Sequence, residues 1–134
     1  MEINQKISVT DVENFAQRVC EVGAVKVRNL YEGWDPNGGA PVHTVAGRYQ
    51  QRGWTEWTEG FQYGCALLAF DVCRDESLLE IGKRQTAERM AGHLSHVGVH
   101  DHGFNTMSTY GNLLRLGLEG QWEASDGELE TCRL

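Results

Sequence analysis

The run Phe61-Gln-Tyr-Gly-Cys-Ala-Leu-Leu-Ala-Phe-Asp-Val-Cys73 decides the fold, because only Gln62 and Asp71 in it are strongly polar. A helix that is apolar on nearly all sides must be buried on most of them. A second sparsely charged run covers residues 104–118. The sequence therefore predicts two inner helices, the first of which begins near Glu59.

Apolar residues also recur at helical spacing before the first inner helix, at positions that include Val12 and Phe15. Thr10 or Asp11 can cap this helix, which we expect to run to about Leu30. A similar amphipathic pattern lies between the two inner helices. The predicted order is therefore outer, inner, outer, inner, and the class is all-α.

The second outer helix is expected over about residues 76–95. Residues 33–53 are predicted to form a long loop, because Gly33, the run Pro36-Asn-Gly-Gly39 and Pro41 disfavour regular structure across most of it. No strand-like alternation of any length competes with the helical patterns. A loop of this length inside a compact domain is usually functional or disordered.

Two loops rich in aromatic and carboxylate side chains precede the inner helices. They are Trp54-Thr-Glu-Trp-Thr-Glu-Gly-Phe61 and His100-Asp-His-Gly-Phe104. Thr58 can cap the first inner helix through its hydroxyl. Because each loop opens a buried helix, we expect the two loops to form one pocket at one end of a helical assembly.

Composition limits the classes of function. The chain has 134 residues, which is usually one domain, and a net charge of −7, which disfavours a broad nucleic-acid surface. No apolar run approaches the roughly 20 residues of a membrane span. The first residues lack the features of a signal peptide, so we predict a cytoplasmic protein that binds neither nucleic acid nor membrane. The four cysteines are widely spaced and are expected to be reduced thiols: Cys20, Cys65, Cys73 and Cys132.

The chain resembles the unsaturated glucuronyl hydrolases and the related unsaturated rhamnogalacturonyl hydrolases in the order of two motifs and two helices. The order is Trp57-Thr-Glu-Gly-Phe61, a buried helix, an amphipathic helix and then His100-Asp101-x-Gly103-Phe104. The resemblance covers about residues 10–118. It implies αα-hairpins that form part of an (α/α)6 toroid. Residues 1–134 would then be a single partial domain, truncated to about a third of the barrel, and the acidic end of the chain, 119–134, could be frayed.

The resemblance implies a carbohydrate-active hydrolase that hydrates 4,5-unsaturated uronic acids at the non-reducing end of oligosaccharides. Asp101 matches the first catalytic aspartate of that family. The family's second aspartate, its principal acid and base, has no matching position before Leu134, so we expect the chain alone to be inactive. The inner helices offer more apolar surface than two hairpins can cover, so self-association is also expected.

The position of Asp101 limits its role. A carboxylate just before a helix can accept a backbone N–H bond and is stabilised as an anion by the helix dipole. An anion is a poor proton donor, so we expect Asp101 to orient the substrate or to stabilise developing positive charge. The alternative is that Asp101 is a plain helix cap.

Four further residues are predicted to bind substrate, each with a structural alternative. Trp57 would face a pyranose ring or anchor the hairpin core, and His100 would bond sugar hydroxyls or backbone. Glu59 would be a site carboxylate or a partner of the helix dipole, and Phe104 a site residue or a core anchor.

No cofactor is expected. His93, His96, His100 and Asp101 could surround a metal only if the second outer helix continued past Ser95. Gly98 and the family pattern indicate that this helix ends first. We therefore predict no metal site.

Two other functions stay open at this point. The chain could be a non-catalytic helical fragment or binding module that keeps only the start of the fold. It could also be a relative of the (α/α)6 sugar epimerases, although the histidine acid–base groups expected later in such a chain are absent here. A coding region that continues with further helix starts rich in Trp and Asp would favour the hydrolase.

Overall fold

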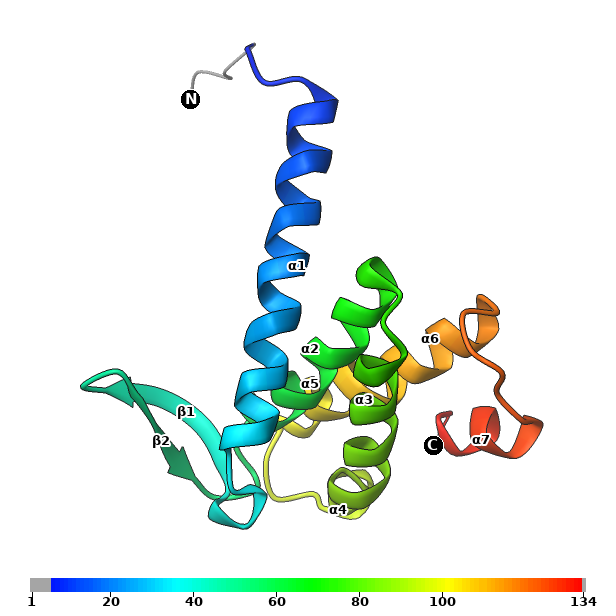
Figure 1. Ribbon diagram of the computed structural model, residues 1–134. Helices are drawn as coiled ribbons and strands as arrows, with labels where there is room; N and C mark the ends of the chain where they lie inside the picture. The colour runs from blue at the N-terminus through cyan, green and yellow to red at the C-terminus, as the bar shows by residue number, and fades with distance from the viewer. Residues whose placement is uncertain (1–5, 134) are drawn as a thin grey trace.

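Helix α2, Thr58–Cys73, lies at the centre of the structure, and most of the other helices pack around it (Figure 1). The structure is a computed structural model and describes residues 6–133. Tyr63, Leu67 and Phe70 of α2 are all buried. These three side chains lie on one face of the helix, and the buried residues Gly64 and Ala69 extend the covered arc to either side of it. Burial over more than half of the circumference confirms the predicted inner helix, and Cys65 and Leu68 are exposed on the remaining strip.

The N-terminus of α2 differs from the prediction. Thr58 is not the cap: Trp57 holds that position, already with helical backbone angles (φ −62°, ψ −21°) and without a capping side-chain bond. The Thr58 hydroxyl lies within the first turn, buried and without a hydrogen-bond partner. At the other end, the Arg74 N–H closes the helix by donating to the carbonyl of Phe70.

Helix α1, Val9–Gly33, is capped by Ser8 and not, as predicted, by Thr10 or Asp11. Ser8 and Asp11 form a reciprocal capping box, in which each side chain accepts a hydrogen bond from the other residue's backbone N–H. Asp11 therefore contributes to the cap from the third helical position. The two-residue error arises because the cap rule does not distinguish neighbouring polar residues.

The C-terminal half of α1 packs on the core, whereas the N-terminal half extends beyond the other helices (Figure 1). Ala24 is buried, and Arg28 forms an ion pair with Asp75 at the turn after α2. By contrast, Val12 and Phe15 are exposed on the extended half. The apolar stripe of α1 is therefore only partly covered.

The predicted loop over residues 33–53 is wrong, because it contains a β-hairpin. A short 3-10 turn, Pro36–Gly38, leads into strand β1, Ala40–Val45, which pairs antiparallel with β2, Arg48–Arg52. The glycines and prolines that suggested a loop mostly precede the hairpin. The connecting residues are Ala46 and Gly47, both with positive φ (49° and 75°).

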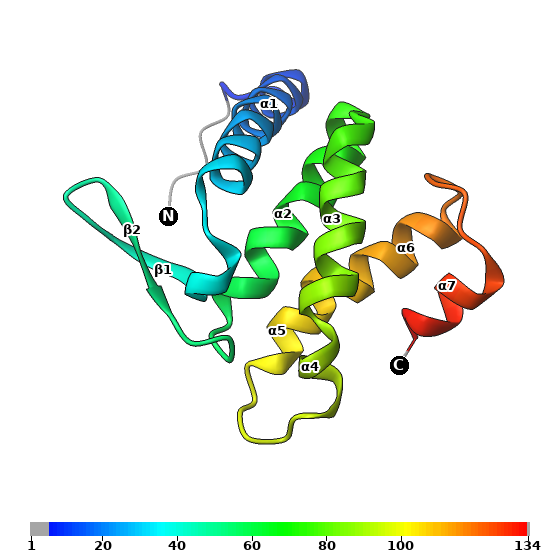
Figure 2. The same ribbon diagram turned by 60° about the horizontal axis from the view of Figure 1, so that its bottom comes forward.

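The hairpin lies to the side of the helices (Figure 2) and is held to the end of α1 by aromatic contacts. Trp34 meets Tyr49 of β2 edge-on, with ring centroids 6.2 Å apart. The Trp34 indole N–H also donates to the carbonyl of Gly39, at 2.9 Å. These contacts fix the hairpin although every residue of β2 is exposed.

The second outer helix is divided into α3, Glu76–Arg89, and α4, Ala91–Ser95. A single helix over 76–95 was predicted. The division occurs at Met90, which is fully buried and has φ −89° and ψ −9°. The short α4 places His93 in the interior, where its side chain is buried.

The second inner helix is one continuous run of α5, His102–Thr106, a π-helical turn, Met107–Gly111, and α6, Asn112–Leu118. It begins two residues before the predicted start and is otherwise confirmed. Thr109 is fully buried and donates its hydroxyl hydrogen to the carbonyl of Asn105, at 2.6 Å. Such π-turns widen a helix locally and are frequent at functional sites.

The acidic end of the chain contains a further helix, α7, Asp126–Thr131, with its own capping box from Ser125 and Glu128. Trp122 ties this segment to α6 by donating its indole N–H to the carbonyl of Leu113, at 3.1 Å. The ammonium group of Lys83 lies over the Trp122 ring, 4.4 Å from its centroid.

The described residues are mostly helical, which confirms the all-α class with one small hairpin added. The main hydrophobic core joins α1, α2, α3 and α6 and consists of Ala24, Leu67, Ala69, Phe70, Leu78, Leu79, Leu113 and Leu116. A smaller cluster joins α2 to the region of Met90: Tyr63, Met90 and Tyr110. Within residues 6–133, no helix is both long enough and apolar enough to cross a bilayer.

Close contact between α2 and the π-turn depends on Gly64. A Cβ added there would lie 2.4 Å from the carbonyl oxygen of Ser108, a backbone atom that cannot easily move. We expect Gly64→Ala to lower the free energy of unfolding by about 1–3 kcal/mol, as overpacking usually does. Gly23→Ala in α1 is the matched control, because a Cβ there meets nothing within 4 Å. It should raise stability by roughly 0.5–1 kcal/mol. Urea denaturation compares the two variants, and equal effects would contradict the close contact.

Candidate functional site

The side chain of Asn105 joins the starts of the two inner helices. Its Oδ1 accepts the backbone N–H of Gly60 at 2.8 Å, and its Nδ2 donates to the carbonyl of Glu56 at 3.2 Å. Asn105 is fully buried, and a Cβ on Gly60 would lie 2.3 Å from the Asn105 Cα. The two motif loops therefore lie at the same end of the molecule.

Three aromatic rings form an exposed surface at this end, which we call the aromatic face: Trp57, Phe61 and Phe104. The ring centroids are 5.4 Å apart for Trp57 and Phe61, 6.2 Å for Trp57 and Phe104, and 6.1 Å for Phe61 and Phe104. Their exposed fractions are 43%, 38% and 50%. Trp57 and Phe104, both predicted site residues, are thus brought together. Neither is a buried core anchor.

Asp101 immediately precedes α5 and lies three residues before Phe104 of the aromatic face. Its backbone carbonyl accepts the N–H of Phe104 at 3.0 Å. Asp101 holds the N-cap position of α5 but makes no capping hydrogen bond through its side chain, so the alternative of a plain helix cap is not observed. Its carboxylate instead pairs with His100, Oδ1 to Nε2 at 3.2 Å. The side chain of His100 is 92% exposed and that of Asp101 is 29% exposed, so both are open to a ligand.

Glu59 does not join this surface. It is buried, and its Oε2 lies 3.3 Å from Nε2 of His93, which is buried as well. The carboxylate of Glu59, in the first turn of α2, therefore points into the interior. A buried carboxylate paired with an imidazole holds neighbouring elements together and is not available to a ligand at the aromatic face.

His93 is the first of three imidazoles in contact, which we call the histidine chain: His93, His102 and His96. Nδ1 of His93 lies 2.8 Å from Nδ1 of His102, and Nε2 of His102 lies 2.6 Å from Nδ1 of His96. Trp54 covers all three rings, stacked on His102 at 5.9 Å and edge-on to the other two at 5.2 Å. His100 lies apart from the chain.

The three imidazoles form a line and do not converge on one point. Both ring nitrogens of His102 are occupied by its neighbours, so that ring has no free nitrogen for a metal. In the part of the chain that the structure describes, no three His, Cys, Asp or Glu side chains are placed to hold a metal ion. Helix α4 ends at Ser95, as the sequence indicated.

The surroundings of His102 shift its proton affinity. Burial lowers the pKa of His102, and the neighbouring imidazoles of His93 and His96 lower it further. The carboxylate of Asp101 acts in the opposite direction. The balance favours the neutral ring more than in a free histidine.

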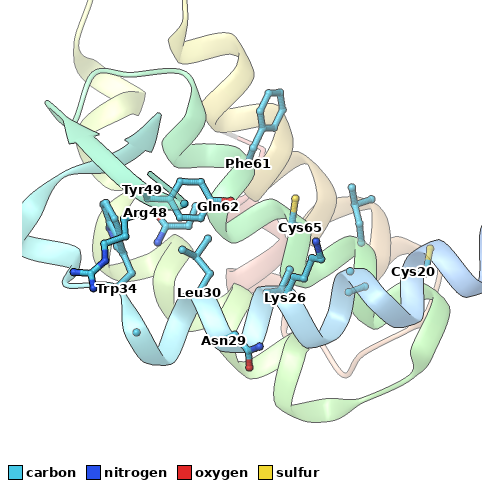
Figure 3. Close-up of a pocket in the computed structure, with 16 residues that line it drawn as sticks. Cys20, Lys26, Asn29, Leu30, Trp34, Arg48, Tyr49, Phe61, Gln62 and Cys65 are labelled. Atoms are coloured by element: carbon cyan, nitrogen blue, oxygen red, sulfur yellow. The ribbon is translucent and has the colours of Figure 1, made fainter. Parts of the chain in front are cut away.

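Two cavities flank this region. A cleft of about 760 Å³ is bordered by His93 and His102 on one side and by α6 and the end of the chain on the other. A groove of about 850 Å³ lies between α1, the hairpin and α2. Figure 3 shows that Leu30, Trp34, Tyr49 and Gln62 gather at one end of this groove, with Cys65 and Lys26 farther along.

Comparisons of the chain with protein-family models, with curated proteins and with solved structures found no match. The functional argument therefore rests on the sequence resemblance and on the geometry of the site.

Sequence reasoning missed Asn105, Trp54 and the joining of His93 to His102. Asn105 follows directly after the His100–Phe104 motif, but nothing in the sequence identifies its partner Gly60. The spacing of the histidines predicted only that their imidazoles would align if the helix continued past Ser95. Their linear arrangement depends on the break at Met90, which no local pattern predicted.

Removing the Asn105 side chain tests the junction of the two loops. Asn105→Ala would leave the buried Gly60 N–H and Glu56 carbonyl without their partner, so we expect a loss of about 2–4 kcal/mol of folding stability. Asn112→Ala, in the same helical run but partly exposed, should cost less than about 1 kcal/mol, because water can replace its hydrogen bonds. Thermal and urea unfolding measure both changes. Similar losses in the two variants would mean that the junction is not critical.

Proposed function

We propose that this chain carries part of a carbohydrate site of the unsaturated-uronide hydrolase type. The observation that carries the proposal is the meeting of the two inner-helix starts, which places the aromatic face and Asp101, three residues before Phe104, at the same end of the molecule. The substrate class is an oligosaccharide that ends in a 4,5-unsaturated uronic acid. The sequence resemblance supplies this class, and the geometry of the site is compatible with it.

The aromatic face offers what a sugar ring needs. One side of a pyranose ring presents C–H groups, and exposed aromatic rings provide an apolar surface against which such groups can be desolvated. Trp57 and Phe104 are about half exposed and held by mutual ring contacts, so little side-chain entropy is lost on binding. Rigid, exposed aromatic rings are typical anchors of binding sites.

Asp101 and His100 supply polar contacts at the edge of this surface. The Asp101 carboxylate can accept hydrogen bonds from sugar hydroxyls, and the His100 imidazole can donate or accept one. An anionic carboxylate close to the ring would also stabilise positive charge that develops when the enol ether is protonated. We therefore assign Asp101 an orienting and charge-stabilising role.

The proton itself would come from another residue. Hydration begins when a carboxylic acid protonates the ring double bond; water then adds, and the hemiketal opens and releases the sugar. Glu59 cannot be that acid at this surface, since it is buried against His93. The resemblance assigns the donor to the family's second aspartate, which has no matching position in this sequence.

The exposed apolar surfaces support the proposal that the helices are an arc of a larger (α/α)6 toroid. Val12 and Phe15 of α1 and Leu68 and Val72 of α2 are between 40% and 69% exposed, and the groove between the two helices is open. Further hairpins would cover such surfaces. In their absence, the same surfaces are those through which the chain would self-associate.

A disaccharide with an unsaturated uronic acid at its non-reducing end tests the site. We expect the chain to bind it weakly, as measured by NMR titration of the indole N–H signals, and to show no loss of the double-bond absorbance. Trp57→Ala should weaken binding by about tenfold, which corresponds to roughly 1.4 kcal/mol. Asp101→Asn should also weaken binding, because the carboxylate acceptors are lost.

Phe15→Ala is the matched control, because Phe15 is an exposed aromatic residue on α1 and not part of the aromatic face. Its affinity for the disaccharide should equal that of the unchanged chain. If Trp57→Ala and Phe15→Ala bind equally well, or if the saturated disaccharide binds as tightly as the unsaturated one, the proposal is wrong.

A further inference from the structure

The protonation of the histidine chain follows from the groups that bond to it, beginning with Asn105. The Gly60 N–H can only donate, so the atom of Asn105 that faces it is the oxygen, and the amide nitrogen faces the other way. That nitrogen lies 3.1 Å from Nδ1 of His93. It carries only donors, so Nδ1 of His93 must accept. The proton of a neutral His93 is then on Nε2, facing Glu59.

The same argument applies at the other end of the chain. The backbone N–H of Gly98 donates to Nδ1 of His96, at 3.2 Å. Nδ1 of His96 is therefore an acceptor as well. His102 thus lies between two acceptor nitrogens, one on His93 and one on His96. Each of them shares its single lone pair between His102 and a second donor, which is the Asn105 amide for His93 and the Gly98 N–H for His96.

A neutral imidazole has one N–H and can donate to only one of two acceptors. Both contacts of His102 are satisfied together only when the ring carries a proton on each nitrogen and is a cation. The stacked Trp54 ring, 5.9 Å away and inclined by 23°, presents its electron-rich face to that cation. The carboxylate of Asp101 favours that cation, and beyond His93 the carboxylate of Glu59 adds a further negative charge.

We infer that His102 is a proton-operated clamp, in which the doubly protonated ring joins buried His93 to exposed His96 and so fixes the segment 96–101. This segment carries His100 and Asp101. The clamp is independent of any ligand. Its effect on sugar binding, through the placement of Asp101, rests on the proposed function.

Loss of one proton opens the clamp on a defined side. The bond to His93 is retained, because His93 is buried and no water can replace its partner there. The bond to His96 is the one that breaks, because water can reach His96. Segment 96–101 then keeps its covalent ends but loses its side-chain anchor.

The direction of the pH dependence follows from the surroundings. Burial, with His93 and His96, lowers the pKa of His102, whereas Asp101 raises it. Across the adjoining cleft, the remaining ionisable groups are Tyr110, Arg115, Glu119, Cys132 and Arg133. The clamp therefore closes as the pH falls below the usual histidine range of about 6.5 and opens as the pH rises.

NMR of the ligand-free chain, labelled with ¹⁵N in its histidine rings, tests this directly. As the pH is lowered, both ring nitrogens of His102 should become protonated. At high pH, the proton of the neutral His93 ring should be on Nε2. The backbone signals of residues 97–101 should shift with the same midpoint as His102.

Gly98→Ala separates the clamp from simple titration. A Cβ at this position would lie 2.3 Å from Cε1 of His96, so the imidazole must move, although no ionisable group is changed. We expect His102 to titrate still, while the coupled shift of residues 97–101 disappears. Gly103→Ala is the control, because a Cβ there meets nothing within 4 Å, and it should leave the coupled shift intact.

Two results would overturn the clamp. In the first, Nε2 of His102 stays unprotonated at low pH while His96 carries its proton on Nδ1. His96 would then be the donor in its contact with His102, and His102 the acceptor. The second is a shift of residues 97–101 that persists in Gly98→Ala. Both measurements are made without sugar, so failure of the disaccharide to bind would leave the clamp standing. Conversely, a failed clamp would leave the aromatic face intact.

Discussion

The hydrogen bond from the Gly60 N–H to the Asn105 side chain is the contact on which the arrangement of the site depends. It is possible because glycine lets the backbone of α2 approach that of α5 closely, and Gly64 extends this approach one turn further. The same amide then reaches His93 through its nitrogen. One buried side chain thus determines the aromatic face and also one end of the histidine chain.

The two inner helices could be predicted from the sequence because the first is apolar on nearly all sides and the second is sparsely charged, whereas an exposed helix carries many charged residues. The hairpin could not. All residues of β2 are exposed, so its sequence lacks the alternation of polarity that marks a half-buried strand. Its turn places Ala46 at positive φ, a conformation that sequence rules assign to glycine or asparagine. Its stability comes from Trp34, outside the strands.

Helix caps show how far local rules extend into the site. Ser8 and Ser125 cap exposed ends through capping boxes, a pattern that is visible in the sequence. Thr58 was the predicted cap of α2, and a cap was the alternative role of Asp101; both lie at helix ends that meet other elements, and neither side chain caps its helix. There, Asn105 satisfies the Gly60 N–H from a distance of 45 residues. The inward turn of Glu59 is likewise set by His93, a tertiary partner that no local pattern reveals.

Helix α1 receives unequal support along its length. Its last turns contact the core and carry the ion pair from Arg28 to Asp75, whereas its first turns have only their own backbone bonds and capping box. An unsupported helix of a few turns is marginal in water, and local opening follows local burial. Amide hydrogen exchange should therefore slow progressively from the first turn toward Ala24. A protease would cut first within the opening turns and leave the buried half of the helix in place.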